Sequence, residues 1–201
     1  MNKLQYEKEI SDIAKGYEIK HGIIKGNSTV FFVKTGLNGS IYGYENKYLE
    51  IAWKVREQFG YTVVISSNPY DKWGGIRFGF TKDHLDVSFK LIDELGGSEV
   101  LLFAHSNGAL MSLMHGHKYP QIKKMVLVNM PLHFSNLSTV NKKAELYKDL
   151  TFIYGSRDDF SFLQKCIKRE IVVVEGEDHN FTKGICDFKT LPFTYLLSDK
   201  L

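Results

Sequence analysis

Three polar side chains that can together perform acyl-transfer chemistry are spread along the sequence in the order serine, aspartate, histidine. Ser106, Asp158 and His179 each follow, within a few residues, a short apolar run of the kind that forms a buried strand. A serine hydroxyl is a weak nucleophile until a base removes its proton during attack on a carbonyl carbon. A histidine can be that base, and a carboxylate holds the imidazole in the required tautomer. Because the carboxyl ends of parallel strands meet at one edge of a sheet, we expect the three side chains to converge there.

The residues around Ser106 predict how this serine is presented. Residues 100–104 (Val-Leu-Leu-Phe-Ala) read as a buried strand, and apolar residues at helical spacing begin at Ala109. A serine at the apex of a strand–turn–helix is the context of a nucleophile elbow. That turn is too tight for large side chains two positions before and after the serine, and here Ala104 and Gly108 occupy these positions. Taken alone, Ser106 is an ordinary turn serine, and its two partners favour the nucleophile interpretation.

Each partner also has a simpler interpretation. Asp158 is followed by a second carboxylate, Asp159, and either of them can pair with Arg157 or cap a following helix. His179 can be a surface histidine after an acidic stretch. Its position just after the last apolar run favours the role of base.

The order and context of these motifs resemble the α/β-hydrolase family, from about Thr29 to the C-terminus. Residues 105–108 (His-Ser-Asn-Gly) are similar to the elbow of that family. Residues 154–158 (Tyr-Gly-Ser-Arg-Asp) are similar to the loop that presents its acid, and 178–181 (Asp-His-Asn-Phe) to the loop that presents its histidine. The family spacing assigns the carboxylate to Asp158, with Asp159 as the alternative.

The resemblance also implies an oxyanion hole, in which backbone N–H groups bind the negatively charged oxygen of the reaction intermediate. By position these are the N–H groups of Asn107 and Leu37. The chain departs from the family at Ala104, where glycine is usual, and at 35–39 (Thr-Gly-Leu-Asn-Gly), which lacks the common His-Gly. Residues 132–149 are too few for a large lid.

Apolar runs alternate with amphipathic segments along most of the chain, which predicts a mostly parallel sheet with helices on both faces. We expect a single α/β domain over residues 1–201, like an α/β hydrolase without a large cap domain. The expected strands are 17–24, 29–34, 62–65, 99–104, 124–129, 150–154 and 171–174. The expected helices are 44–59, about 85–95, 109 to before 120, a patch at 144–147, 160–168 and 182–197. Gly26-Asn27 predicts a hairpin between the first two strands, and residues 1–15 are either a helical turn or irregular.

Composition narrows the function classes. Hydrophobic residues make up 43% and charged residues 24% of the chain, and the net charge is only +3. The charges are interspersed, so nucleic-acid binding has little support. The longest apolar runs are far shorter than the roughly 20 residues of a membrane-spanning helix, and the first residues lack a signal-peptide core. Cys166 and Cys186 lack CxxC spacing. These features favour a cytoplasmic location, and a disulfide between the two cysteines stays open.

No metal or cofactor is expected. The sequence has no dinucleotide-binding fingerprint. His115 and His117 are two residues apart, so on a helix they point to different faces, and with His133 they make no convincing metal set.

The leading hypothesis is a serine hydrolase that cleaves a small-molecule ester or thioester. We assign its substrate pocket to Trp73, Met130 and Leu132, although packing of a long loop and of a buried connection explains the same residues equally well. The alternatives are a non-catalytic binding or regulatory protein of the same fold, and a serine peptidase or acyltransferase. The sequence predicts no oligomeric state.

Overall fold

The computed structural model describes residues 4–69, 81–159, 163–184 and 186–198. Its eight strands form one sheet in the order β1-β2-β4-β3-β5-β6-β7-β8. Strands β3 to β8 are parallel to their neighbours within this group, whereas β2 is antiparallel to both β1 and β4. This confirms the predicted α/β architecture with a mostly parallel sheet.

The elements agree with most of the expected ranges. The strands are β1 (Lys8–Ala14), β2 (Tyr17–Ile24), β3 (Asn27–Lys34), β4 (Tyr61–Ser66), β5 (Glu99–His105), β6 (Ile122–Val128), β7 (Leu150–Gly155) and β8 (Ile171–Val174). The α-helices are α1 (Lys47–Phe59), α2 (Thr81–Glu94), α3 (Asn107–His115), α4 (Phe134–Ala144) and α5 (Leu191–Tyr195). Short 3₁₀ turns are η1 (Tyr44–Asn46), η2 (Gly116–Lys118), η3 (Gln164–Cys166) and η4 (Phe188–Thr190).

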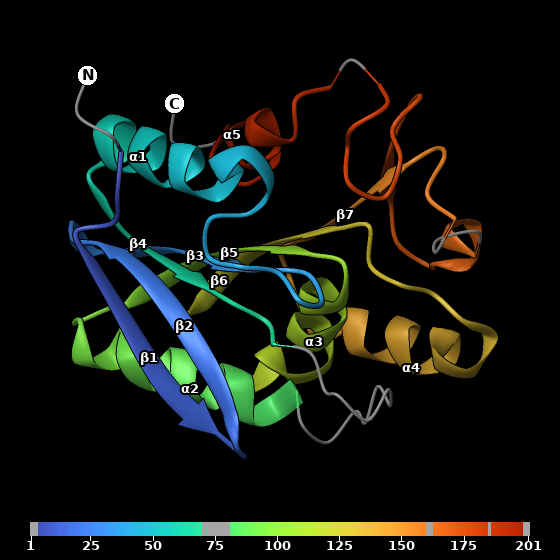
Figure 1. Cartoon of the computed structure of the whole chain (residues 1–201). Coiled ribbons are helices and arrows are strands. Elements are labelled where there is room, and N and C mark those ends of the chain that lie inside the picture. Colours follow the sequence, from blue (N-terminus) through green and yellow to red (C-terminus); the bar gives the residue numbers. More distant parts are fainter. Residues whose placement is uncertain (1–3, 70–80, 160–162, 185, 199–201) are drawn as a thin grey trace.

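Helices cover both faces of the sheet. Figure 1 shows α1 and α5 over one face and α2, α3 and α4 over the other. On β3, Val30 and Phe32 belong to the core under α2 and α3, and Phe31 and Val33 belong to the core under α1. Strands buried on both faces need apolar residues at successive positions, which explains the unbroken apolar runs of the sequence.

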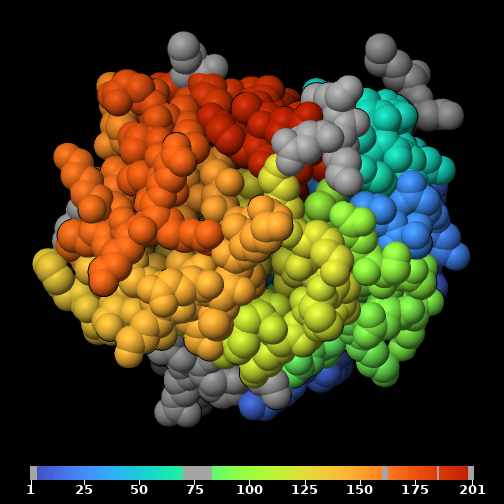
Figure 2. Space-filling view, turned by 180° about the vertical axis from the view of Figure 1, so that it is seen from behind, coloured from blue at the N-terminus to red at the C-terminus, as the bar shows by residue number. Residues whose placement is uncertain are grey.

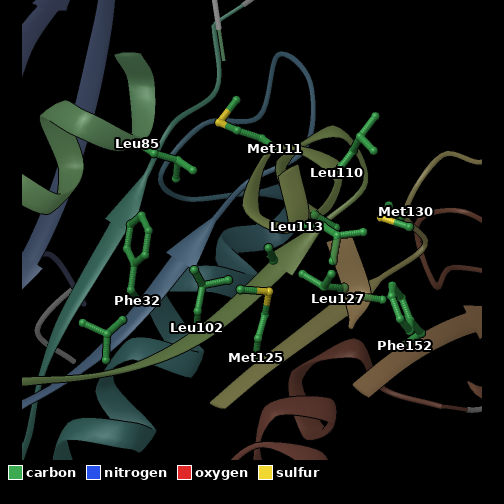
Figure 3. Packing of buried hydrophobic residues seen from close by; sticks show 14 of the residues in the cluster. Phe32, Leu85, Leu102, Leu110, Met111, Leu113, Met125, Leu127, Met130 and Phe152 are labelled. Carbon is green, nitrogen blue, oxygen red and sulfur yellow. The ribbon is translucent and has the colours of Figure 1, made fainter. Parts of the chain in front are cut away.

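Figure 3 shows the first of these cores, where side chains from the strands, among them Phe32 and Leu102, meet Leu113 from α3. Seen from behind, the blue N-terminal strands and the orange C-terminal segments occupy opposite sides of the molecule (Figure 2). This follows from the strand order, which puts β1 at one edge of the sheet and β8 at the other.

The chain reverses its direction across the sheet at β3. Strand β4 lies on one side of β3 and β5 lies on the other. Beyond the carboxyl ends of two strands at such a switch point, an α/β sheet leaves a crevice in which ligands bind. Ser106 directly follows β5, and the loop with Leu37 directly follows β3, so both stand at this crevice.

The first hairpin was predicted in the wrong place. Residues 8–14 form a strand rather than a helical turn, and β1 pairs with β2 along its whole length. The connecting residues Lys15 and Gly16 have φ values of 48° and 85°, as a tight two-residue hairpin turn requires. The turn predicted at Gly26-Asn27 does not make a hairpin, because β4 lies between β2 and β3.

Three helices also differ from the expected ranges. The helix expected at 144–147 instead covers Phe134–Ala144, where Asn136, Val140 and Ala144 form the buried stripe. The helix expected over 182–197 is limited to η4 and α5, with Pro192 in its first turn. Of the helix expected at 160–168, the described part contains only η3.

Candidate functional site

The backbone at Ser106 has a conformation that few residues adopt. Its φ of 54° and ψ of −127° lie outside the regions open to ordinary L-residues. The Ser106 N–H donates to the carbonyl of Val128 in β6 at 2.8 Å, and the Ser106 carbonyl accepts from Ala109 N–H at 2.9 Å in α3. Strained residues of this kind persist where the surrounding structure holds them and are concentrated at functional sites.

Gly108 is required by the close approach of α3 to the end of β3. A Cβ atom at Gly108 would lie 2.2 Å from the Thr35 carbonyl oxygen and 2.6 Å from that of Lys34. No side chain fits at this distance. At the position two residues before the serine, the methyl group of Ala104 is accommodated in the core, where it is fully buried. This explains why alanine is tolerated there.

The structure brings Ser106, His179 and Asp158 into one line of hydrogen bonds. The Ser106 Oγ lies 2.8 Å from His179 Nε2, and His179 Nδ1 lies 2.8 Å from Asp158 Oδ1. The side chain of Asp158 is fully buried, and that of His179 is 21% exposed. With its Nδ1–H donated to the carboxylate, the imidazole has an unprotonated Nε2 that can accept a proton from the serine. The arrangement has the geometry of an activated serine nucleophile.

Of the two adjacent carboxylates, Asp158 is the one against His179, whereas Asp159 is exposed at the surface. The loop that carries Asp158 lies directly against the loop that carries His179. The Arg157 N–H donates to the Glu177 carbonyl at 2.9 Å, and a Cβ atom at Gly155 would lie 2.4 Å from the same oxygen. The end of β7 therefore packs directly on the loop that carries His179.

The two residues predicted to supply oxyanion N–H groups lie beside the serine. A Cβ atom on Gly36, the residue before Leu37, would lie 3.1 Å from the Ser106 Cβ. The Asn68 amide joins this loop to the elbow, because its Nδ2 donates to Asn107 Oδ1 at 3.1 Å and to the Thr35 carbonyl at 3.3 Å. Donation by Leu37 and Asn107 N–H groups to an oxyanion stays a prediction.

Asn129, which the sequence analysis did not single out, connects three strand ends. Its Oδ1 accepts from Gly155 N–H at 2.8 Å, and its Nδ2 donates to the carbonyls of Asp178 at 3.0 Å and His179 at 2.9 Å. The side chain is fully buried, and φ is 46°. Asparagine tolerates this left-handed conformation better than most residues. The signal in the sequence that could have indicated this role was an asparagine directly after an apolar strand.

His105 also makes a hydrogen bond to the loop that carries His179. Its Nε2 lies 2.8 Å from the His179 carbonyl oxygen, which can only accept, so Nε2 carries the hydrogen. Burial lowers the pKa of His105 to about 3, with the Lys47 charge as a further cause. His105 is therefore neutral at pH 7. The carbonyl of His179 is thus held by two side chains, those of His105 and Asn129.

A second group of buried polar side chains lies beside the end of β3. The Lys34 Nζ donates to Ser66 Oγ at 3.0 Å and to the Ser67 carbonyl at 2.5 Å. Ser88 Oγ donates to Ser66 Oγ at 3.0 Å and lies 3.0 Å from His21 Nε2. Complete burial lowers the pKa of Lys34 to about 7. This cluster was not predicted, because a lysine at the end of an apolar strand reads as an exposed residue.

The structure describes two of the three residues predicted to line the substrate pocket. Met130 and Leu132 are both fully buried in the core, where Figure 3 shows Met130 near Leu127. This position fits the alternative that the sequence left open, in which these residues pack a buried connection. Their contact with a substrate stays a prediction. Trp73 lies outside the described residues.

Three further findings concern only the part of the chain that the structure describes. Within it, no three His, Cys, Asp or Glu side chains gather in a way that could hold a metal ion. No helix there is both long and apolar enough to cross a membrane. Cys166 and Cys186 are both free thiols.

Comparison with solved structures identifies the fold. Est1E from Butyrivibrio proteoclasticus superposes with a TM-score of 0.69 at 10% identity, covering 96% of this chain and 97% of that one. The thioesterase domain from the curacin biosynthetic pathway gives a TM-score of 0.67 at 15% identity, covering 94% and 99%. A lidless α/β serine hydrolase from Xanthomonas campestris gives 0.64 at 15% identity, covering 100% and 98%. The chain has the α/β-hydrolase fold.

The similarity to these proteins is one of structure and not of sequence. No protein-family model matches the chain, and no curated protein matches it in sequence. The α/β-hydrolase fold is therefore established by the arrangement of strands and helices. The chemistry of the site depends on the residues at the crevice.

Proposed function

We propose that the protein is a serine hydrolase that cleaves a carboxylic ester or thioester through an acyl-enzyme on Ser106. The observation that carries the proposal is the line of hydrogen bonds from Asp158 through His179 to Ser106, at the apex of a strained elbow. The occurrence of the same fold in a thioesterase domain and a lidless serine hydrolase supports a hydrolase.

In the first half of the reaction, His179 Nε2 takes the Ser106 proton while Oγ attacks the carbonyl carbon. The buried Asp158 carboxylate stabilises the imidazolium that forms. The N–H groups of Asn107 and Leu37 bind the oxyanion of the tetrahedral intermediate. The intermediate then collapses, and the leaving alcohol or thiol takes the proton from His179.

In the second half, His179 removes a proton from a water molecule, and the resulting hydroxide attacks the acyl-enzyme carbonyl. The second tetrahedral intermediate expels Ser106, which recovers its proton from the imidazolium. The acid product leaves, and the enzyme returns to its starting state.

The test compares two neighbouring carboxylates. Asp158→Asn leaves the shape of the site intact but supports the wrong imidazole tautomer, so hydrolysis of p-nitrophenyl acetate should fall by about 10⁴-fold. Asp159→Asn removes an exposed carboxylate one residue away and should leave the rate unchanged. A fluorophosphonate probe should label the wild type and fail to label Ser106→Ala.

Equal rates in wild type and Ser106→Ala would remove this serine from the mechanism. Absence of labelling in a folded wild type would instead favour the non-catalytic binding protein. Product analysis with added alcohol, thiol or peptide substrates separates hydrolysis from acyl transfer and peptide cleavage.

A further inference from the structure

A cavity of about 750 Å³ lies next to the loop that carries His179. Its wall on one side is Asn180 and Phe181, which directly follow His179, together with Phe188 from η4. Tyr44 of η1 and Lys47, the first residue of α1, also line the cavity. The cavity is thus lined by the continuations of the two loops that flank Ser106, the one after β3 and the one after β8.

Lys47 gives this cavity a positive charge that is not neutralised by a salt bridge. Its Nζ lies 3.9 Å from the centre of the Phe188 ring and 5.4 Å from that of Tyr48. Among the residues that the structure describes, no carboxylate lies within salt-bridge distance of it. Burial lowers the pKa of Lys47 to about 8, against the opposing influence of Asp178. At pH 7 the side chain is a half-buried cation against aromatic rings.

The acidic groups nearby are engaged elsewhere or exposed. Asp187 of the lining accepts from Lys189 N–H at 2.9 Å and lies 3.7 Å from Lys189 Nζ. The Asp178 carboxylate accepts from the N–H groups of Asn180 at 3.0 Å and Thr182 at 2.9 Å, and from Thr182 Oγ1 at 2.7 Å. Glu45 also lines the cavity, but it is exposed, and water screens its charge. Lys189, the other lysine of the lining, is already paired with Glu50 at 2.9 Å.

The position of the cavity relates it to one half of the substrate. In serine hydrolysis the histidine gives its proton to the leaving group, so the leaving group lies on the histidine side of the serine. Asn180, next to His179, belongs to the cavity wall. The cavity wall therefore continues from the histidine loop, on the side of Ser106 from which the leaving group departs. An ammonium with unused hydrogen-bond donors binds an anionic group there.

We propose that this cavity is a leaving-group subsite for an ester or thioester whose alcohol or thiol half carries a carboxylate or phosphate, bound by Lys47. The inference rests on the proposed serine hydrolase function and adds a substrate class to it. The cavity places the charged group away from the scissile bond. The acyl half of the substrate is left on the other side of Ser106.

The test uses esters that share an acetyl group and differ in the charge of the leaving group. These are 4-nitrophenyl acetate, its ring-carboxylated analogue, and 4-acetoxyphenyl phosphate. The measured quantity is the ratio of kcat/KM for each anionic ester to kcat/KM for the neutral one. Lys47→Met should lower this ratio at least about tenfold, as loss of a hydrogen bond to a charged group does. Lys47→Arg, which keeps the charge, should retain most of it.

Lys54→Met is the matched control, because it removes the same charge from an exposed position of the same helix. It should leave the ratio unchanged. The factor by which Lys47→Met lowers the ratio for each anionic ester then shows whether a carboxylate or a phosphate fits better. A ratio that Lys47→Met does not lower, or that Lys54→Met lowers equally, would overturn the proposal.

A binding measurement separates this proposal from the proposed function. Titration of Ser106→Ala protein with phenyl phosphate and with benzoate, followed by calorimetry, should show binding that Lys47→Met abolishes. If this binding is seen but Ser106 hydrolyses none of the esters, the subsite stands and the serine chemistry fails. If Ser106-dependent hydrolysis is seen without anion binding or charge preference, the subsite fails and the serine chemistry stands.

Discussion

Replacing Asn129 by aspartate should damage the proposed catalytic site more than it damages the fold. The substitution keeps the shape of the side chain, its tolerance of the positive φ and an Oδ1 acceptor for Gly155 N–H. It replaces the Nδ2 donor by an oxygen that faces the carbonyls of Asp178 and His179 at about the distances of the present bonds, 3.0 and 2.9 Å. Two attractive contacts become repulsive, and the histidine loop must move away.

The expected loss of stability follows from the two hydrogen bonds that Nδ2 now donates. The His179 carbonyl keeps its hydrogen bond from His105, and the Asp178 carbonyl keeps the one from Phe181 N–H at 3.2 Å. Each lost hydrogen bond costs about 0.5–1.5 kcal/mol. Burying the new carboxylate adds to this cost, so we expect a loss of about 3 kcal/mol or more. For a chain of this size that lowers Tm by about 6–12 °C.

The expected loss of activity comes from displacement of His179. A shift of about 1 Å in a catalytic group can cost 10²-fold in rate. We therefore expect the rate of fluorophosphonate labelling at Ser106 to fall by about 10²-fold in Asn129→Asp. Urea denaturation at the same pH gives the folded fraction, by which the labelling rate is corrected.

The control is a variant with similar destabilisation far from this loop. Ile92 in α2 is fully buried, and its side chain lies near Gly97 and Val30, towards the amino ends of β3 and β5. Ile92→Ala should cost about 2–5 kcal/mol and leave the corrected labelling rate unchanged. The reasoning is refuted if Asn129→Asp is labelled at the wild-type rate, or if Ile92→Ala slows labelling equally.

Two further predictions concern stability as a function of pH. The folded-state pKa of Lys34 is about 7, below the ordinary value of 10.5, so between these values the unfolded chain binds more protons. The contribution of Lys34 to stability should therefore rise with pH from 7 to 10, and a urea titration of Lys34→Met should lack this rise. Burial lowers the pKa of His21 and of His105 to about 3 each. Between pH 6.5 and 3 the unfolded chain again binds more protons, so acid should lower the free energy of unfolding. The slope is at most about 1.4 kcal/mol per pH unit for each histidine, and a His21→Asn variant should show a smaller slope than the wild type.

The candidate site was predictable because its signals are local. Each of Ser106, Asp158 and His179 follows an apolar run, and such a run is recognisable as a strand without knowing its neighbours. The elbow adds the requirement for small residues, which Gly108 meets. Parallel strands then carry all three side chains to the same edge, and no knowledge of strand order is needed to expect it.

What the sequence did not reveal depends on contacts between distant segments. Strand β1 forms because β2 provides a partner, while its own residues alternate only weakly between exposed and buried positions. Asn129 is informative only when Gly155 and the carbonyl of His179 are known to lie beside it. Lys34 can be buried because Ser66 Oγ and the Ser67 carbonyl accept hydrogen bonds from its Nζ, and neither neighbour is apparent from the local sequence.

The relative positions of the three loops are set by the sheet itself. The ladder of hydrogen bonds continues one residue past the end of each strand: Ser106 N–H donates to the Val128 carbonyl, and Asn129 N–H donates to the Ile153 carbonyl, both at 2.8 Å. Ser156 N–H donates to the Val174 carbonyl at 3.0 Å. Each loop therefore starts at a position fixed by the next strand. Ser106 and Asn129 then turn through positive φ values, of 54° and 46°, at the ends of adjacent strands. Because sites on rigid elements hold their geometry better than sites on loops, the Ser106–His179 distance depends on strand register first. Loop sequences that shape the substrate pocket can vary without disturbing it.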